Sequence, residues 1–201
     1  MQSAQRAQFL AVNYSRLQGL KGFPIGLLLL VTVLWANTPT IDRNWVLLFM
    51  VAVLSLALHI GVDRYYASRY GIVEGKPRQK QMDYAAAVLG GLAGLVAFLA
   101  EITYDLSFSP VGLVFAAAAL FEYFRIVQVG KHAFYRWLML LSFLVILAAS
   151  LLPLVGLGHL WQSLGLRSSL LGILLVTSLV MLVTSLFGHL YFARQFPSEE
   201  S

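Results

Sequence analysis

Six segments of the chain are almost wholly apolar, and short polar stretches separate them. They cover about residues 20–37, 45–62, 84–103, 111–130, 137–155 and 169–192. Each is close to the roughly 20 residues that a helix needs to cross the hydrocarbon core of a bilayer. Lipid offers no water to backbone N–H and C=O groups, so we expect each segment to be helical. The pattern predicts one all-α integral membrane domain over residues 1–201, a six-helix bundle made of three in–out–in helical hairpins.

The composition agrees with this interpretation. Hydrophobic residues make up 59% of the chain and charged residues 11%, against roughly 45–50% and 25% in soluble domains. These values exclude a soluble enzyme and a disordered chain, and the absence of cysteine excludes disulfides. The longest polar stretch, residues 63–83, is too short for a soluble catalytic domain, and no Walker, dinucleotide-binding, HExxH or GxSxG motif is present. We therefore expect a non-catalytic protein rather than an enzyme.

The basic residues predict the direction of the spans, because Lys and Arg collect on the cytoplasmic side of a membrane. With the N-terminus inside, two basic residues fall on the outer side, Arg43 and Arg167, and eleven on the inner side. The inner set is Arg6, Arg16, Lys21, Arg64, Arg69, Lys76, Arg78, Lys80, Lys131, Arg136 and Arg194. We therefore expect both termini in the cytoplasm and a location in the plasma (inner) membrane. The same distribution explains the net charge of +5 without a nucleic-acid partner.

Charged residues within a span are costly, which makes them candidates for function. The fourth segment holds Glu122 and Arg125, and Glu122 lies nine residues before Lys131, a depth of roughly 13 Å from the inner interface. With Ser55 and Ser178, these two residues form a predicted intramembrane polar site. One hypothesis makes Glu122 a proton or cation site. The other pairs it structurally with Arg125, three residues further along the same helix.

Three further ionisable residues lie near the ends of spans. His59 and His189 are predicted at similar depths, and two facing histidines can ligate a haem b or a metal ion. The alternative is a pair of interfacial imidazoles without a cofactor. No other cofactor is expected. Glu101, at the outer end of the third segment, is expected to be solvated.

Small residues recur at a four-residue spacing on two neighbouring segments. The third segment carries Ala86, Gly90 and Gly94, and the fourth carries Gly112 and Ala116. Small residues at this spacing let helix backbones approach closely. The pattern predicts tight packing of the third segment against the fourth, with a seam between two copies of the chain as the alternative.

The polar stretch at residues 63–83 is predicted to be a basic cytoplasmic loop. It carries Arg64, Arg69, Lys76, Arg78 and Lys80. Basic side chains at a membrane surface attract anionic headgroups. This loop is therefore expected to contact anionic lipids or a partner protein, with simple retention on the cytoplasmic side as the alternative.

The sequence leaves three functions open. The first is a non-catalytic membrane subunit or scaffold that packs with another membrane protein or with a second copy of the chain. The second is a transporter or channel for a small solute, an ion or a proton that uses Glu122. The third is an intramembrane haem or metal protein that uses His59 and His189.

Overall fold

The computed structural model of this chain describes residues 18–39, 44–70, 77–104, 106–127 and 133–195, all of them helix or connecting turn. The helices are η1 (Gly19–Gly22), α2 (Phe23–Asn37), α3 (Trp45–Tyr70), α4 (Pro77–Thr103), α5 (Pro110–Val127), α6 (Ala133–Leu151), η3 (Leu152–Val155), α7 (His159–Ser163) and α8 (Ser169–Gln195). The described part of the chain contains no strand. The predicted all-α class is confirmed.

Within the described ranges, five helical segments are long and apolar enough to cross a membrane, which indicates an integral membrane protein. They are Gly19–Asn37, Trp45–Arg69, Gln81–Thr103, Tyr135–Val155 and Ser169–Arg194. The predicted span at residues 111–130 corresponds to α5, which has 18 residues and ends at Val127. Because α5 is not among these five, the arrangement of six spans in three hairpins stays a prediction.

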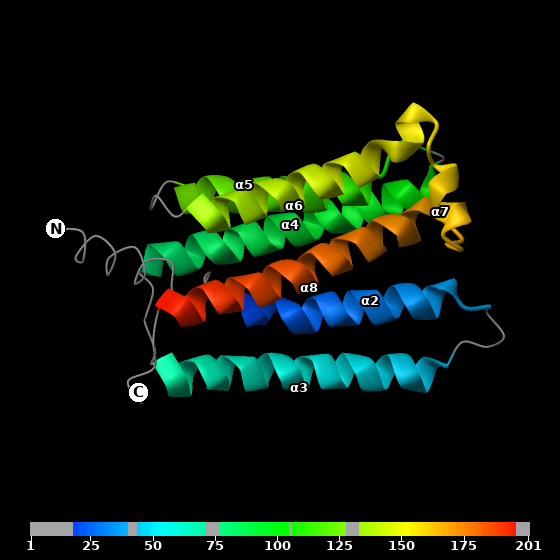
Figure 1. Cartoon of the computed structure of the whole chain (residues 1–201). Helices are drawn as coiled ribbons and strands as arrows, with labels where there is room; N and C mark the ends of the chain where they lie inside the picture. The colour runs from blue at the N-terminus through cyan, green and yellow to red at the C-terminus, as the bar shows by residue number, and fades with distance from the viewer. Residues whose placement is uncertain (1–17, 40–43, 71–76, 105, 128–132, 196–201) are drawn as a thin grey trace.

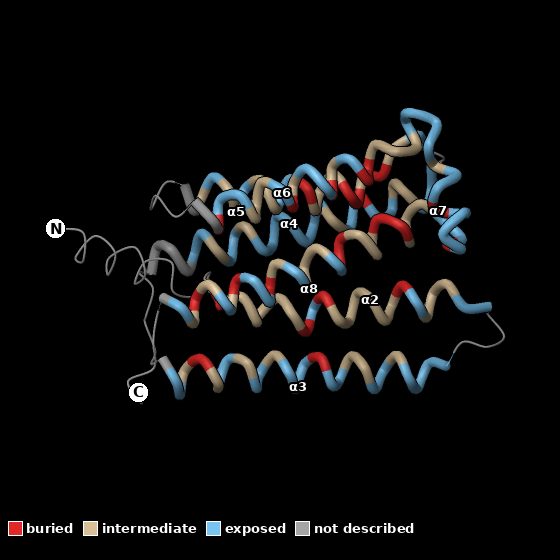
Figure 2. Tube along the Cα trace, viewed as in Figure 1, coloured by how far each residue is buried: buried red, intermediate tan, exposed pale blue. Residues whose placement is uncertain are grey.

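The long helices lie side by side along one direction (Figure 1). From one edge of the bundle to the other, α3 packs on α2, α2 on α8, α8 on α6, α6 on α5, and α5 on α4. Most of the buried positions lie on the central helices, whereas α3 and α4 are exposed along most of their length (Figure 2). The core is therefore built around α8, α2, α6 and α5.

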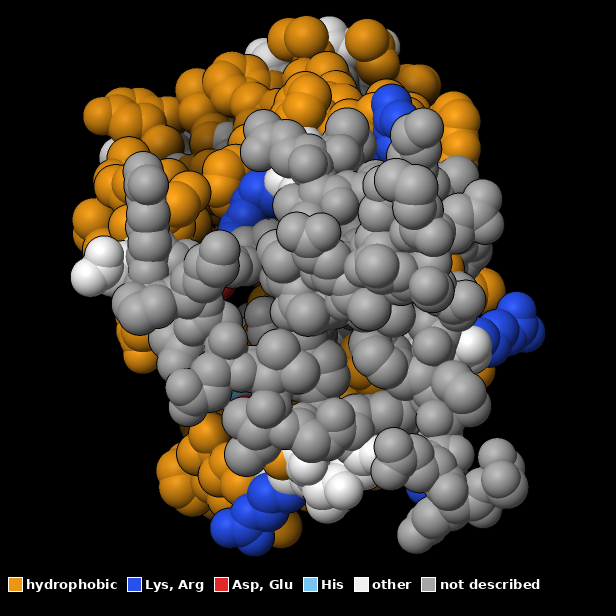
Figure 3. All heavy atoms as spheres, turned by 90° about the vertical axis from the view of Figure 1, so that its left-hand side faces the viewer, with side chains coloured by type: hydrophobic (Ala, Val, Ile, Leu, Met, Phe, Trp, Pro, Cys, Tyr) orange, Lys and Arg blue, Asp and Glu red, His pale blue; other side chains and the backbone are white. Residues whose placement is uncertain are grey.

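The described Lys and Arg side chains gather at one end of the bundle, where α2, α4 and α6 begin and α3, α5 and α8 end. We call this end the basic end. Figure 3 views it directly, with Lys and Arg side chains around its rim and hydrophobic side chains on its flanks. Arg167 is the described basic residue at the opposite end, between α7 and α8.

Small and hydroxyl-bearing residues fill much of the interior, while many large apolar side chains face outward. Two buried clusters mark the two ends of the core. Tyr66, Tyr135 and Phe192 pack together at the basic end. The cluster at the opposite end contains Val33, Ala149, Trp161, Leu166 and Ile173. This distribution is typical of helices in lipid, where small residues allow contact between backbones and large apolar ones meet the acyl chains.

Two close contacts between helices occur at glycines on α5 and η1. A Cβ atom at Gly112 would lie 2.1 Å from the Ser150 hydroxyl oxygen on α6 and 2.9 Å from the Ile173 methyl on α8. A Cβ atom at Gly19 would lie 2.5 Å from the backbone N of His189. Hydrogen in place of a side chain is therefore what lets η1 and α5 approach their neighbours.

The predicted tight packing of Ala86, Gly90 and Gly94 is wrong at the two glycines. Asp83 and Glu101 both contact α5. They are 18 residues apart, which is five helical turns, so they lie on one face of α4, and Gly90 and Gly94 lie on the same face. Nevertheless, no atom lies within 4 Å of a Cβ built at Gly90 or Gly94. Contacts at the two ends of α4 hold it against α5 without a close approach in the middle.

Gly112 and Ala116, the small residues predicted to receive that contact, are buried elsewhere. Gly112 faces Ser150 on α6 and Ile173 on α8, and Ala116 is buried as well. The backbone N–H of Ser109 donates to the carbonyl of Ser150 at 3.0 Å. The tight seam of α5 is therefore with α6 and α8.

Glu101 caps the N-terminus of α5, which corrects the expectation that it is solvated. The Ser109 hydroxyl lies 2.8 and 2.7 Å from its two carboxylate oxygens, and the Val111 backbone N–H donates to it at 3.0 Å. The first N–H groups of a helix have no partner within the helix, so a carboxylate from α4 satisfies one of them.

The predicted basic loop at residues 63–83 is mostly helical in its described part, which corrects the prediction of a loop. α3 continues to Tyr70, and α4 begins at Pro77, a residue suited to the first turn of a helix. Arg64 and Arg69 are exposed on the last turns of α3. The backbone of α4 includes Arg78 and Lys80, whose side chains lie outside the described part, as does the whole of Lys76.

We expect Gly112→Ala and Gly94→Ala to change stability in opposite directions, although both place a methyl group on a helix. Gly112→Ala forces Ser150 and Ile173 apart and should cost roughly 1–3 kcal/mol. Gly94→Ala meets open space and gains helix propensity, up to about 1 kcal/mol. Thermal unfolding of the detergent-solubilised protein measures both. Equal melting temperatures for the two variants would contradict the packing described here.

Candidate functional site

A cavity of about 390 Å³, partly open to the surroundings, lies between helices in the half of the bundle nearer the basic end. Its walls come from η1, α5, α6 and α8. Along α6 the lining runs from Tyr135 to Ile146, which is eleven residues or roughly 16 Å at about 1.5 Å per residue. The volume is within the range of about 300–1,000 Å³ that is usual for small-molecule sites. This cavity is the candidate functional site.

The part of the cavity nearer the basic end carries most of its polar groups. Gln18 and Lys21 contribute from the η1 region, Glu122 from α5, Tyr135 from α6 and Ser185 from α8. The deeper part is lined mainly by apolar side chains, namely Phe115, Met139, Ile146, Val180 and Met181. The cavity therefore changes from polar to apolar along its length.

Two buried polar atoms on the cavity wall have no hydrogen-bond partner among the described residues. They are the amide oxygen of Gln18 and the hydroxyl of Thr177. Gln18 is 5% exposed and Thr177 1% exposed. A buried polar group without a partner costs free energy, roughly 1–3 kcal/mol, so such groups call for an explanation. A bound molecule that offers a hydrogen bond is one explanation.

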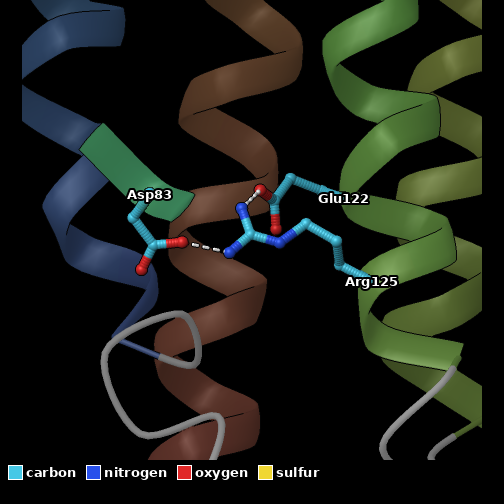
Figure 4. A network of polar contacts seen from close by, with 3 residues as sticks. All are labelled: Asp83, Glu122 and Arg125. Atoms are coloured by element: carbon cyan, nitrogen blue, oxygen red, sulfur yellow. Dashed lines mark hydrogen bonds and ion pairs between the residues drawn. The ribbon is translucent and has the colours of Figure 1, made fainter. Parts of the chain in front are cut away.

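Beside the cavity, Arg125 pairs with two carboxylates (Figure 4). Its guanidinium donates to Glu122, one turn earlier on α5, at 2.9 Å and also to Asp83 on α4. The guanidinium lies over the ring of Phe121 as well, 5.1 Å from the centroid. The predicted structural pair of Glu122 with Arg125 is therefore present.

Asp83 is a member of this site that the sequence did not single out. The hydropathy pattern places it in a polar loop, whereas the first turns of α4 carry it to Arg125. Two carboxylates share one guanidinium, so the formal charge of the group formed by Asp83, Glu122 and Arg125 is −1.

Glu122 lies near the basic end of α5. It lies five residues before Val127, where α5 ends, so roughly 8 Å from the helix end. Its contact through Arg125 to Asp83, near the start of α4, agrees with this position. The carboxylate thus belongs to the polar part of the cavity and not to its apolar depth.

Lys21, the cation on the cavity wall, already has a partner. Its ammonium lies 2.7 Å from the carboxylate of Asp63 on α3. His59 lies 3.9 Å from the same carboxylate through its Nε2 atom. Lys21 is therefore held toward α3, and its charge is compensated there.

His189 takes part in a hydrogen-bonded contact between three elements. The Tyr66 hydroxyl lies 3.0 Å from His189 Nδ1, and it accepts the backbone N–H of Leu20 at 3.3 Å. This contact joins α3, α8 and η1 near the basic end. His59 and His189, the predicted haem or metal ligands, thus contact different residues, and no group of three metal-binding side chains occurs in the described ranges.

The two serines of the predicted polar site lie apart from Glu122. Ser55 is buried on α3, whose packing partners are α2 and η1, and its hydroxyl has no partner among the described residues. Ser178 is buried on α8 and donates to the Leu175 carbonyl at 2.7 Å. Its neighbour Thr177, which the sequence analysis did not single out, faces the cavity instead.

Beyond the deep end of the cavity, the second buried cluster closes the bundle. Trp161 on α7 packs against Gly172 on α8, where an added Cβ would lie 2.3 Å from the indole ring. Leu166 and Ile173 belong to the same cluster. The interior is therefore hollow toward the basic end and packed toward the opposite end.

Comparisons of the chain with family models, curated proteins and solved structures gave no match. The chemistry of the cavity therefore carries the functional argument. The composition of the spans did point to Glu122 and Arg125, because charges are rare there. Gln18 and Thr177 gave no comparable signal, since neutral polar residues are common in all parts of such a chain.

Asp83→Asn and Arg125→Gln should be energetically coupled, because each removes the same ion pair. We expect the double variant to lose about 0.5–1 kcal/mol less stability than the sum of the single variants. The coupling is at the low end of the range for contacting residues because Asp83 is 41% exposed. Thermal unfolding of the four proteins measures it. As a matched control, the stability losses of Asp83→Asn and Arg136→Gln should add, since Arg136 contacts Tyr123 instead. Coupling between Asp83 and Arg136, or no coupling between Asp83 and Arg125, would contradict the network.

Proposed function

We propose that this chain is a small membrane transporter whose substrate site is the cavity beside Glu122. The observation that carries the proposal is a cavity of about 390 Å³ whose described wall includes the Glu122 carboxylate and two buried polar atoms that have no hydrogen-bond partner among the described residues. A bundle that served only as a scaffold would gain stability by filling such a space, because packing defects and unpaired polar groups both cost free energy.

The orientation that we propose places the basic end in the cytoplasm. Lys21, Arg64 and Arg136 lie there, against Arg167 at the opposite end, and cytoplasmic ends carry the excess of Lys and Arg. With α5 as the sixth span, the helices form three in–out–in hairpins in the plasma (inner) membrane. The exposed Arg64 and Arg69 are then suited to contact anionic headgroups.

In this orientation the structure corresponds to an inward-facing state. The cavity occupies the cytoplasmic half, and the cluster around Trp161 separates it from the outside. Transport by alternating access requires that this cluster separate while the cytoplasmic half closes. The contact of Tyr66, His189 and η1 lies where that closing movement would act.

A single introduced cysteine tests whether the cavity is reached from both sides, because the chain contains no cysteine of its own. We expect Thr177→Cys, at the deep end of the cavity, to react with a small membrane-impermeant methanethiosulfonate from either face of a proteoliposome. Ala117→Cys is the matched control, since Ala117 is exposed and does not line the cavity. Its thiol should meet lipid, which disfavours the reactive thiolate. Reaction of Thr177→Cys from one face only would exclude a transporter.

Trp161→Ala should loosen the outer closure. Removing the indole takes away its packing against Gly172, which favours states open to the outside. We expect labelling of Thr177→Cys from the outer face to become about tenfold faster, the change that about 1.4 kcal/mol of lost packing gives. Trp137→Ala, at an exposed tryptophan of the basic end, is the control and should leave the rate unchanged. An unchanged rate in Trp161→Ala would show that the cluster is not the closure.

A scaffold or subunit is the second candidate, and the exposure of α3 and α4 favours it. Both helices are exposed along most of their length, and each packs mainly on one neighbour, α3 on α2 and α4 on α5. Another membrane helix, from a partner or from a second copy, could cover the face of α4 that points away from α5. Purification from native membranes should then give a partner in constant ratio, and Leu92→Trp, at an exposed position of α4, should remove it.

A further inference from the structure

We infer that the cavity binds a neutral, elongated amphiphile, with an uncharged hydrogen-bond donor at Gln18 and a second hydrogen-bonding group at Thr177. This inference rests on the proposed function, since it names the substrate class of the same site. Three observations support it. The charged side chains on the described wall have partners, two neutral polar groups there have none among the described residues, and these two groups lie at different depths.

The two charged side chains on the described wall of the cavity are paired with opposite charges. The ammonium of Lys21 lies 2.7 Å from the carboxylate of Asp63. The carboxylate of Glu122 accepts from the guanidinium of Arg125 at 2.9 Å. A ligand with a charge of its own would have to leave water for a mostly apolar space in which both wall charges are already engaged, and that transfer is costly. The wall therefore favours a neutral ligand.

Thr177 differs from two other hydroxyl-bearing residues on the cavity wall. Ser142 and Thr184 donate to carbonyls of their own helices, those of Leu138 and Met181, at 2.7 and 3.1 Å. Thr177 is 1% exposed, and its hydroxyl has no hydrogen-bond partner among the described residues. A hydroxyl both donates and accepts. A hydroxyl or carbonyl group of a ligand can therefore bind to Thr177.

Gln18 provides the second neutral polar group. It is 5% exposed, and its amide oxygen has no hydrogen-bond partner in the described part of the chain. Although Gln18 is the N-cap residue of η1, its side chain makes no capping hydrogen bond to that helix. An amide oxygen only accepts hydrogen bonds, so the ligand must donate to it. A hydroxyl group can do so without carrying a charge.

The two neutral groups lie far apart along the cavity. Gly19, which follows Gln18, packs on the backbone of α8, since a Cβ there would lie 2.5 Å from the Ser185 oxygen and from the His189 nitrogen. Thr177 precedes Ser185 by eight residues on the same helix, which is roughly 12 Å at about 1.5 Å per residue. A small solute does not span this distance. The two groups therefore favour an elongated molecule.

The wall between these two depths requires an apolar body. Val180 and Met181 lie between Thr177 and Ser185 along α8, and Met139 lines the same cavity from α6. Burial of apolar surface against such walls favours binding. Thioether side chains adapt to different shapes, so they accept a range of apolar bodies. The ligand class is therefore a neutral aliphatic chain with a polar group at each end.

Four probes with the same eight-carbon chain and different end groups test this inference. They are 1,8-octanediol, 1-octanol, 8-hydroxyoctylammonium and 8-hydroxyoctanoate, and the last two stay charged near neutral pH. Binding to the full chain in phosphatidylcholine nanodiscs is measured by calorimetry, with the heat from empty nanodiscs subtracted. We expect the diol to bind, and each charged probe to bind about tenfold or more weakly than the diol, because neither wall charge is available to compensate it.

Variants of the two neutral groups test the hydrogen bonds. Thr177→Val removes the hydroxyl and keeps the shape of the side chain. We expect it to lower the affinity for the diol about tenfold relative to that for octanol, because octanol has no second hydroxyl to lose a partner. Gln18→Leu should lower the same ratio for the same reason. Ser178→Ala is the matched control and should leave the ratio unchanged, since Ser178 donates to Leu175 and does not line the cavity.

A second pair of variants locates the binding. Ala119→Phe fills the cavity and should abolish binding of the diol. Ala117→Phe places the same ring at an exposed neighbour outside the lining and should not.

The outcomes separate the two proposals. An unchanged ratio in Thr177→Val would mean that water satisfies this hydroxyl, and it overturns the inference. Tighter binding of a charged probe than of the diol by the wild-type chain overturns it whether or not any variant folds. If Ala119→Phe still abolishes binding in these cases, the cavity remains a binding site and the proposed function stands. Binding of the diol that persists in Ala119→Phe, or no binding of the diol, also overturns the inference, while labelling of Thr177→Cys decides the proposed function separately.

Discussion

In a bilayer, an apolar side chain gains little by leaving lipid for the surface of another helix, so helix association depends on close backbone contact and on polar groups. Here that contact is made at Gly112 on α5 and at Gly19 on η1. Both contacts involve α8, which also packs against α2 and α6. The position of η1 is decisive for the cavity, because η1 supplies one of its walls.

The same constraint explains why the cavity persists beside such close contacts. η1 is held against α8 near Ser185 and His189, and α5 is held against α6 and α8 near Gly112, at the other end of its length. Between these two contacts the walls carry residues such as Phe115 and Met139, whose bulk keeps the helices apart. Polar groups then collect where the walls diverge, at Glu122 and Gln18.

The hydropathy pattern predicted the all-α class and the approximate bounds of the long helices, because a bilayer demands continuous apolar segments. The hydropathy pattern could not predict where helices continue beyond the apolar segments. Polar residues such as Arg, Lys and Gln also form helices well, so a polar stretch can be either a helical turn or a loop. For that reason the stretch at residues 63–83 was expected to be a loop, and Asp83 was not linked to Arg125. Spacing predicted the pair of Glu122 with Arg125 because three residues bring side chains together on any helix.

Small residues show the limit of sequence reasoning most directly. Gly90, Gly94 and Gly112 are all glycines within apolar segments of the sequence. Gly112 nevertheless lies in a tight seam, whereas no atom lies within 4 Å of a Cβ built at either of the other two. The difference comes from the ion pair of Asp83 and from the cap formed by Glu101, which fix α4 at its ends and leave its middle apart from α5. Polar contacts, rather than the glycines, therefore set the distance between these two helices. It follows that charged residues near the two ends of α4 determine where this helix lies.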